Sequence, residues 1–290
     1  MVAVDLPVSR RAVMVQGIGV IFVASVLFGA MAVCVRLAVR EMPAMQVAWV
    51  RFTGSLLVLL AATRGRGLRP RAANVGPLLL RGLLGASAII LYYVGIQGAG
   101  AGFATLLHCT YPISTAVFAV TVMGEAFSAR LVTALALNLT GVVIVLGGAA
   151  VSPQVTLGGM SALAASVFAG GAVATARHLR ATENAALITT YFMFVGTLLT
   201  TPALMATVPP LTESLAAALV GVVVTSVAGQ WLLHHGLGYT SATQGSLAAA
   251  TSVVTAAALE AAFLGEHVSL HTLAGACFMI IAVGLAVGRR

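Results

Sequence analysis

Charged residues are scarce in this sequence. Only 8% of its 290 residues are Asp, Glu, Lys or Arg, whereas soluble domains carry roughly a quarter. Lysine is absent, and all fifteen basic residues are arginine. Hydrophobic residues make up 60% of the chain, and its mean hydropathy is +1.06. This composition excludes an ordinary soluble domain and predicts a membrane protein.

Cysteine is also rare, and the sequence has no recognisable metal-ligand pattern. Three cysteines lie far apart inside apolar runs, and their odd number excludes a disulfide framework. They are Cys34, Cys109 and Cys277. His267 and His271 stand four residues apart beside Glu266, but no third strong ligand is near them. We therefore expect neither a metal site nor a cofactor.

Long apolar runs are abundant instead. Runs of about twenty residues cross the roughly 30 Å of hydrocarbon in a bilayer. Ten of them follow one another, at about residues 15–39, 44–63, 75–98, 100–123, 130–151, 157–180, 184–207, 213–237, 240–264 and 271–288. The first is too long for the apolar part of a signal peptide. We predict an all-α integral membrane protein with ten transmembrane helices.

The arginines gather near the ends of these runs. If the N-terminus is cytoplasmic, twelve arginines fall on or near the cytoplasmic side, and only Arg36, Arg40 and Arg51 fall toward the other side. The twelve are Arg10, Arg11, Arg64, Arg66, Arg69, Arg71, Arg81, Arg130, Arg177, Arg180, Arg289 and Arg290. This bias predicts that both termini are cytoplasmic, and it explains the net charge of +8 without nucleic-acid binding.

The chain resembles itself at an offset of 141 residues. The matches extend over five runs without a gap. They are Ala24-Ser25-Val26 with Ala165-Ser166-Val167, Gly29 with Gly170, Arg36 with Arg177, Gly95 with Gly236, Leu106 with Leu247, Thr110 with Thr251, Gly124-Glu125 with Gly265-Glu266, and Ser128 with Ser269. We therefore predict two five-helix repeats, residues 1–150 and 151–290, with Ser128 and Ser269 as N-caps of the last helix in each.

An odd number of spans per repeat implies that the second repeat enters the membrane upside down. Inverted repeats are typical of secondary transporters, whose substrate site lies near the midplane between the halves. We therefore expect the ten helices to surround a central cavity.

The ten spans, the duplication and the Gly-Glu pairs that close the fourth and ninth spans resemble the drug/metabolite transporter superfamily, in its EamA-type branch. The resemblance covers nearly the whole chain. It implies alternating access, with spans one to four and six to nine around the cavity and spans five and ten at the periphery. It also implies export of amino acids and other small metabolites. It transfers no substrate residue, because these vary within the family.

Polar residues in the fourth span mark it as a candidate for the substrate site. Pro112 cannot donate an amide hydrogen bond to the carbonyl of His108, so we predict a hinge between them. His108 and Tyr111 lie on one broad side of that bend. Because ionisable residues inside a membrane commonly mark transport pathways, we expect His108 and Tyr111 to line the cavity. The alternative is that His108 bonds to a neighbouring helix and that Pro112 is a packing kink.

Further candidates for substrate binding come from other spans. They are Tyr92, Tyr93, Gln230, Trp231, Arg51, Trp49 and Tyr191. Adjacent helical residues point about 100° apart, so we expect only one of Tyr92 and Tyr93 to face the cavity. Trp231 either forms an aromatic wall or packs between helices. Arg51 either binds a substrate carboxylate, or snorkels outward or pairs with Glu41. His234 and His235 are expected at a wet cytoplasmic rim.

Glu260 lies about one turn inside the ninth span and has Ala119 as its counterpart in the first repeat. The repeat therefore does not require a carboxylate there. We hypothesise that Glu260 or His108 couples transport to protons. The alternative is that Glu260 pairs with an arginine.

These features predict a secondary transporter, and the family resemblance implies that it lies in the bacterial cytoplasmic (inner) membrane. It is expected to export a small polar metabolite, an amino acid or a relative. Alternatives are a carrier of aromatic or quaternary-ammonium compounds or drugs, or an uncoupled, facilitative uniporter. The sequence shows no arrangement of residues typical of an enzyme active site and no selectivity-filter sequence of a channel. The expected partners are the substrate, the lipid bilayer and, as a candidate, protons; the oligomeric state stays open between monomer and homodimer.

Overall fold

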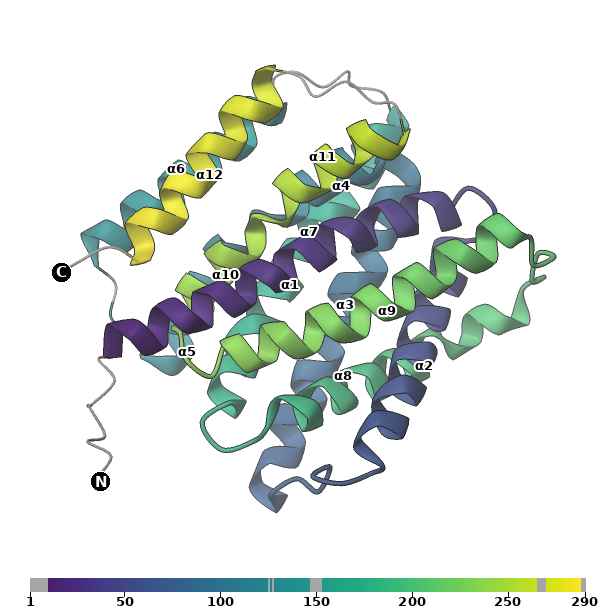
Figure 1. Ribbon diagram of the computed structural model, residues 1–290, viewed down its shortest axis with the longest axis horizontal. Coiled ribbons are helices and arrows are strands. Elements are labelled where there is room, and N and C mark those ends of the chain that lie inside the picture. The colour runs from purple at the N-terminus through teal and green to yellow at the C-terminus, as the bar shows by residue number, and fades with distance from the viewer. Residues whose placement is uncertain (1–9, 125, 127, 147–152, 265–269, 288–290) are drawn as a thin grey trace, which may run out of the picture.

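A computed structural model describes residues 10–124, 126, 128–146, 153–264 and 270–287, and within them all regular structure is helical (Figure 1). The helices are α1 (Arg10–Ala38), α2 (Ala44–Thr63), η1 (Ala72–Asn74), α3 (Val75–Ala99), α4 (Ala101–His108), α5 (Tyr111–Met123), α6 (Ala129–Leu146), α7 (Pro153–Leu179), α8 (Ala185–Thr200), η2 (Thr201–Met205), α9 (Glu213–Gly236), α10 (Ala242–Ala250), α11 (Ser252–Leu264) and α12 (Leu270–Val287). The prediction of an all-helical membrane protein is confirmed.

The described residues contain eight segments that are long and apolar enough to cross a membrane. Two of them are interrupted helices, α4 with α5 and α10 with α11. The expected fifth and tenth spans are represented by shorter apolar helices, Ala129–Ile144 and Leu273–Ala286. Helices thus lie at all ten expected positions, and eight of them meet the length of a membrane span within the described residues. The last residues expected in those two spans, up to 151 and 288, lie outside the described residues.

Polar side chains fix the points at which several helices begin. The N-caps of α8, α9 and α10 are Asn184, Thr212 and Ser241, and each accepts a hydrogen bond from a backbone amide three residues later. Ser128 accepts a bond from the amide of Leu131 in the same way, as expected for the start of α6. Gly124 ends α5 with φ of +65°, a conformation that favours glycine. Glu125, Gly265, Glu266 and Ser269 lie outside the described residues.

Both interrupted helices break at a threonine. Between α4 and α5, the hydroxyl of Thr110 donates to the carbonyl of Leu107 at 2.8 Å; between α10 and α11, the hydroxyl of Thr251 donates to Ala248 at 2.7 Å. Each hydroxyl thus adds a second hydrogen bond to a carbonyl in the last turn before the break, which also accepts from the backbone amide of the same threonine. Pro112 stands in the first turn of α5, but the second break has no proline. The paired threonines are therefore the feature that the two breaks share.

Helices from the two halves pack in exchanged pairs. α1 lies along α9, and α3 lies along α7. A Cβ added to Gly95 would lie 3.0 Å from the carbonyl oxygen of Gly158, and one added to Gly236 would lie 2.8 Å from that of Gly17. Both glycines let two backbones approach closely. Residues 141 positions apart thus make the same contacts with the halves exchanged.

α6 and α12 lie side by side along one edge of the molecule (Figure 1). Their backbones are close, because a Cβ on Gly141 would meet the carbonyl oxygen of Gly275 at 2.7 Å. The other helices form the body of the molecule. The long polar side chains described below lie between these helices. Two large hydrophobic clusters are buried in the molecule, and Val142 of α6 and Met279 of α12 belong to the second of them.

Candidate functional site

A cavity with an empty volume of roughly 710 Å³, open solvent included, lies between the long helices. Every described long span contributes to its lining, and α6 and α12 contribute no residue. The lining residues are Phe28, Met31, Arg51, Arg81, Gly85, Ala88, Ile89, Tyr92, Thr105, His108, Tyr111, Ala169, Ala172, Val173, Phe192, Gln230, Leu233, Ala249 and Ser252. None of them is acidic.

Many lining residues occupy equivalent positions in the two halves of the chain, but their side chains differ in chemistry. Seven pairs of lining residues stand 141 positions apart, so the cavity is shared by equivalent surfaces of the two halves. The pairs are Phe28 with Ala169, Met31 with Ala172, Arg51 with Phe192, Ile89 with Gln230, Tyr92 with Leu233, His108 with Ala249, and Tyr111 with Ser252. In most pairs one half contributes a polar or large side chain and the other a smaller or apolar one. The first half supplies most of the polar groups.

Arg51 reaches the cavity from α2 and is fully buried. Its Nε donates to the hydroxyl of Ser226 on α9 at 2.7 Å, and its guanidinium carbon lies 5.2 Å from the Phe52 ring centroid and 5.7 Å from those of Tyr93 and Phe192. Nη1 and Nη2 have no hydrogen-bond partner among the described residues. Those two nitrogens form the fork that binds a carboxylate through two parallel bonds.

The structure excludes the two alternative roles of Arg51, snorkelling to the surface and pairing with Glu41. A side chain that is 0% exposed does not snorkel to a surface. Glu41 is engaged elsewhere, because it accepts hydrogen bonds from the hydroxyls of Thr212 at 2.6 Å and Ser214 at 2.7 Å. These bonds hold the pKa of the Glu41 carboxyl below its usual value, with Thr212 contributing most.

Arg81 is a second buried arginine on the cavity, a position that the sequence analysis did not predict. It was counted among the arginines near a span end, yet it is only 2% exposed. Its guanidinium carbon lies 4.4 Å from the centroid of Phe192, and its Nε and Nη1 have no partner among the described residues. Gly85, one turn later, leaves the space that the guanidinium fills, because a Cβ there would lie 2.0 Å from Nη1.

His234 holds Arg81 in place and is fully buried, which corrects its expected position at a wet rim. Nη2 of Arg81 lies 2.9 Å from Nε2 of His234, and Nδ1 of His234 lies 2.7 Å from the hydroxyl of Thr189. That hydroxyl donates its proton to the carbonyl of Ala185 at 2.7 Å. It must therefore accept from Nδ1, so the network assigns the proton to Nδ1 and leaves Nε2 to accept from Arg81.

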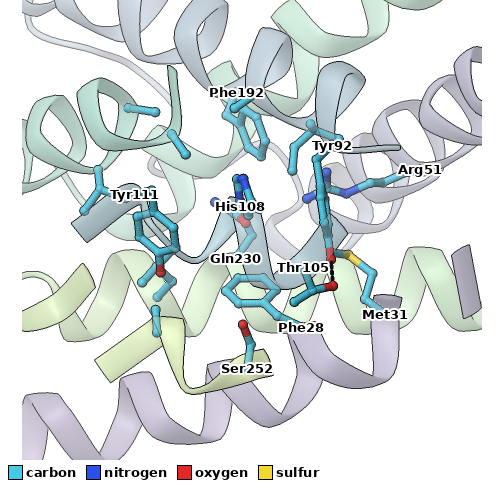
Figure 2. Close-up of a pocket in the computed structure, with 18 of the residues that line it drawn as sticks. Phe28, Met31, Arg51, Tyr92, Thr105, His108, Tyr111, Phe192, Gln230 and Ser252 are labelled. Atoms are coloured by element: carbon cyan, nitrogen blue, oxygen red, sulfur yellow. Dashed lines mark hydrogen bonds between the residues drawn. The ribbon is translucent and has the colours of Figure 1, made fainter. Parts of the chain in front are cut away.

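Three aromatic rings form one wall of the cavity. His108 stacks on Tyr92 with centroids 4.6 Å apart and an interplanar angle of 21°, and Tyr111 lies 5.4 Å from His108 on the other side (Figure 2). The hydroxyl of Tyr92 is hydrogen-bonded to Thr105, and Nδ1 of His108 has no partner among the described residues. His108 is thus held by stacking, with a ring nitrogen left for a ligand.

Gln230 and Ser252 add further polar groups to the lining (Figure 2). Gln230 comes from α9 and brings an amide, whose oxygen can accept and whose nitrogen can donate a hydrogen bond. Ser252 comes from the start of α11, where its hydroxyl lies 3.8 Å from the sulfur of Cys109. The two interrupted helices therefore meet the cavity at their breaks.

The structure places the other candidates away from the cavity. Trp231 is 41% exposed and stacks on His235 at 5.6 Å, because its neighbour Gln230 takes the inward direction and adjacent helical residues diverge by about 100°. Tyr93 is buried beside Arg51, while Tyr92 lines the cavity. Trp49 and Tyr191 are partly buried outside the lining.

Glu260 lies in α11 and is only 4% exposed, but it does not line the cavity. Within the described part of the chain, no group of three or more His, Cys, Asp or Glu side chains is arranged to hold a metal ion. Glu266 and His267 lie outside the described residues. The chemistry of the cavity is therefore that of arginine, aromatic and amide groups.

Comparison with known proteins assigns a family to this arrangement. A model of the EamA-like transporter family matches residues 15–147 and again residues 156–288, and the two matches begin and end 141 residues apart. Two relatives, each named pseudopaline exporter CntI, come from Pseudomonas aeruginosa strains UCBPP-PA14 and ATCC 15692. Each is 25% identical over 268 residues, which cover 92% of this chain and 94% of the relative. A crystal structure with 17% sequence identity superposes with a TM-score of 0.75, covering 93% of this chain and 96% of that one, and so shares the fold.

Proposed function

Because this chain belongs to the EamA-like transporter family, we propose that it is a secondary carrier that exports a small, carboxylate-bearing metabolite by alternating access. Amino acids and related compounds are the substrate class that fits best. The membrane is the bacterial cytoplasmic membrane, with both chain termini on the cytoplasmic side. Export is supported by the two relatives named as exporters and the orientation by the arginine bias of the sequence.

The single observation that carries the substrate class is the pair of buried arginines on a cavity without acidic lining residues. Removing a guanidinium from water costs several kcal/mol unless an anion or good hydrogen bonds compensate. Arg51 and Arg81 each keep two nitrogens without a partner among the described residues. A carboxylate satisfies the two terminal nitrogens of Arg51 through parallel bonds, and an anionic oxygen can accept from Nε or Nη1 of Arg81.

The alternating-access mechanism rests on the exchanged contacts of the two halves. We propose that residues 1–150 and 151–290 are inverted repeats that enclose the cavity on a pseudo-two-fold axis. The paired lining residues and the exchanged helix pairs α1–α9 and α3–α7 support this arrangement. In such a carrier, rocking of the helix pairs exposes the same central site first to one side and then to the other.

The three adjacent aromatic rings of the wall favour a second candidate, a carrier of planar aromatic compounds. Tyr92, His108 and Tyr111 present ring faces that suit stacking. Quaternary-ammonium cargo fits this cavity poorly, because two arginines line it and no acidic residue does. An aromatic substrate with a carboxylate satisfies both the rings and the arginines.

A thermal-shift screen of the purified protein against amino acids, carboxylates, aromatic amines and quaternary-ammonium compounds tests the substrate class. A ligand that binds the folded state raises the unfolding temperature as its concentration exceeds Kd. We expect carboxylates to stabilise the protein and amines without a carboxylate to leave it unchanged. Stabilisation by cations alone would overturn the proposal.

Proteoliposomes loaded with the stabilising compound test the mode of transport. Labelled substrate should enter against its gradient in exchange for unlabelled substrate inside, and the rate should saturate. Linear, unsaturable flux would instead indicate a channel. The same vesicles test the proton hypothesis, since Glu260→Gln should alter the pH dependence of transport if Glu260 carries the coupled proton.

A further inference from the structure

We propose that the cavity contains two separate anion subsites, one at Arg51 and one at Arg81, and that the substrate carries two acidic groups. This inference rests on the proposed function, because it specifies which carboxylate-bearing metabolites the carrier accepts. Dicarboxylates and acidic amino acids are the chemical class that fits. Monocarboxylates of similar size should bind far more weakly.

The two arginines enter the cavity from opposite ends of the spans. Arg51 stands seven residues after the start of α2, and Arg81 stands six residues after the start of α3. Consecutive spans run in opposite directions, so each arginine lies about 10 Å from a different end of the bundle at 1.5 Å per residue. The two arginines therefore reach the cavity from backbone positions at different depths in the bundle.

Each guanidinium is anchored separately. Ser226 holds Nε of Arg51, and His234 holds Nη2 of Arg81. These anchors leave Nη1 and Nη2 free on Arg51 and leave Nε and Nη1 free on Arg81. Because both side chains are tethered and buried, neither can swing across to share an anion held by the other without losing its own anchor.

Phe192 stands beside both guanidinium groups. Its ring centroid lies 5.7 Å from the guanidinium carbon of Arg51 and 4.4 Å from that of Arg81. The apolar ring offers no hydrogen bond, so it suits the hydrocarbon that joins two acidic groups. Ile89 and the stacked ring of His108 line the same space.

Charge balance distinguishes one acidic group from two. The lining residues carry two guanidinium charges and no carboxylate. A substrate with one carboxylate leaves one buried cation unpaired, whereas a substrate with two neutralises both. Isosteric amides isolate this effect, because a monoamide keeps the size of a dicarboxylate and removes one charge.

The test compares matched ligands by thermal shift and by counterflow in proteoliposomes. The pairs are glutarate with its monoamide, and L-glutamate with L-glutamine. A hydrogen-bonded charge contributes enough that we expect the diacid to bind on the order of ten- to a hundredfold more tightly than its amide. Equal binding of diacid and amide would overturn the inference and leave the proposed carboxylate carrier standing. If neither member of either pair binds, both the inference and the carboxylate proposal fail.

Two glycine variants of α3 test the role of Arg81 without removing its charge. Gly85→Ala places a methyl group where Nη1 of Arg81 and an edge of Phe192 now lie, so it displaces the end of a flexible side chain. Gly76→Ala is the matched control, because nothing lies within 4 Å of its added Cβ. We expect Gly85→Ala to bind glutarate and its monoamide about equally and Gly76→Ala to keep the wild-type preference. An unchanged preference in Gly85→Ala would contradict the Arg81 subsite.

Discussion

Arg51 and Phe192 occupy equivalent positions in the two halves of the chain, 141 residues apart, and they meet across the cavity with the guanidinium carbon 5.7 Å from the ring centroid. Their helices, α2 and α8, also pack against each other. The duplicated scaffold thus brings two equivalent sites together, and one copy supplies a cation where the other supplies an aromatic face.

This relationship explains how a duplicated fold forms a site to which its two halves contribute different side chains. The family match covers both halves, and seven pairs of equivalent positions line the same cavity, so a substitution in one copy changes the chemistry of one part of the lining. His108 has Ala249 as its counterpart on the cavity, and Tyr92 has Leu233. The first half therefore supplies most of the hydrogen-bonding groups on the cavity, and the second half adds those of Gln230 and Ser252.

Arg51→Met should leave the ligand-free protein as stable as the wild type or make it more stable. Replacing a buried, incompletely paired cation by a hydrophobic side chain is commonly neutral or stabilising. The same change should weaken binding of carboxylates by roughly 2–5 kcal/mol, because the ligand charge loses its partner. Melting curves with and without glutarate measure both effects. A variant that is strongly destabilised yet still shifts with glutarate would assign Arg51 a structural role.

His234→Phe should weaken dicarboxylate binding by about 1.5–3 kcal/mol, the range for hydrogen bonds to charged groups. The phenyl ring cannot accept from Arg81, so the guanidinium loses its anchor. His234→Gln keeps an acceptor oxygen and should retain most of the affinity. Isothermal titration with glutarate compares the three proteins. Equal affinities for all of them would show that Arg81 needs no anchor at His234.

The sequence predicted the helical membrane fold, the positions of most spans and the internal offset, because apolar runs and repeated residues can be identified from the sequence alone. It also named Arg51, Tyr92, His108, Tyr111 and Gln230, which the structure places on the cavity. Polar residues inside apolar runs are the signal that identified them.

The remaining features of the site depend on how each helix is rotated about its axis and on how deep each residue lies in the bundle. The pattern of residues along the sequence does not determine either. Trp231 and Gln230 are neighbours, and only the packing of α9 decides which of them turns inward. Arg81 lies within two turns of a span end, so the sequence grouped it with interfacial arginines. Phe192 gives no signal in an apolar run; the offset of 141 residues from Arg51 is the clue that could have found it.

Glu41 should stabilise the α1–α2 connection only while it is ionised. Its pKa is lowered from the usual value of 4.5 by hydrogen bonds from Thr212 and Ser214, so its contribution is present above that value and is lost as the pH falls through the lowered pKa. Glu41→Gln should therefore unfold at a lower temperature than the wild type at neutral pH. The difference should shrink below about pH 4. A difference that stays constant across this range would contradict the role of the ionised carboxylate.

Replacing either threonine at the helix breaks should affect transport more than folding. Thr110→Val and Thr251→Val remove hydroxyls that bond to the carbonyls of Leu107 and Ala248. Each lost bond costs about 1 kcal/mol of stability, and the interrupted helices that carry His108 and Ser252 lose their defined ends. Counterflow rates and melting temperatures should separate the two effects. Thr121→Val, on the exposed side of α5, is the matched control.

The most direct test of the account is an experimental structure of the protein saturated with glutarate. We predict one carboxylate within hydrogen-bond distance of Nη1 and Nη2 of Arg51, the second against Arg81, and the carbon chain beside Phe192. A ligand bound outside this cavity, with both guanidinium groups still unpaired, would contradict it.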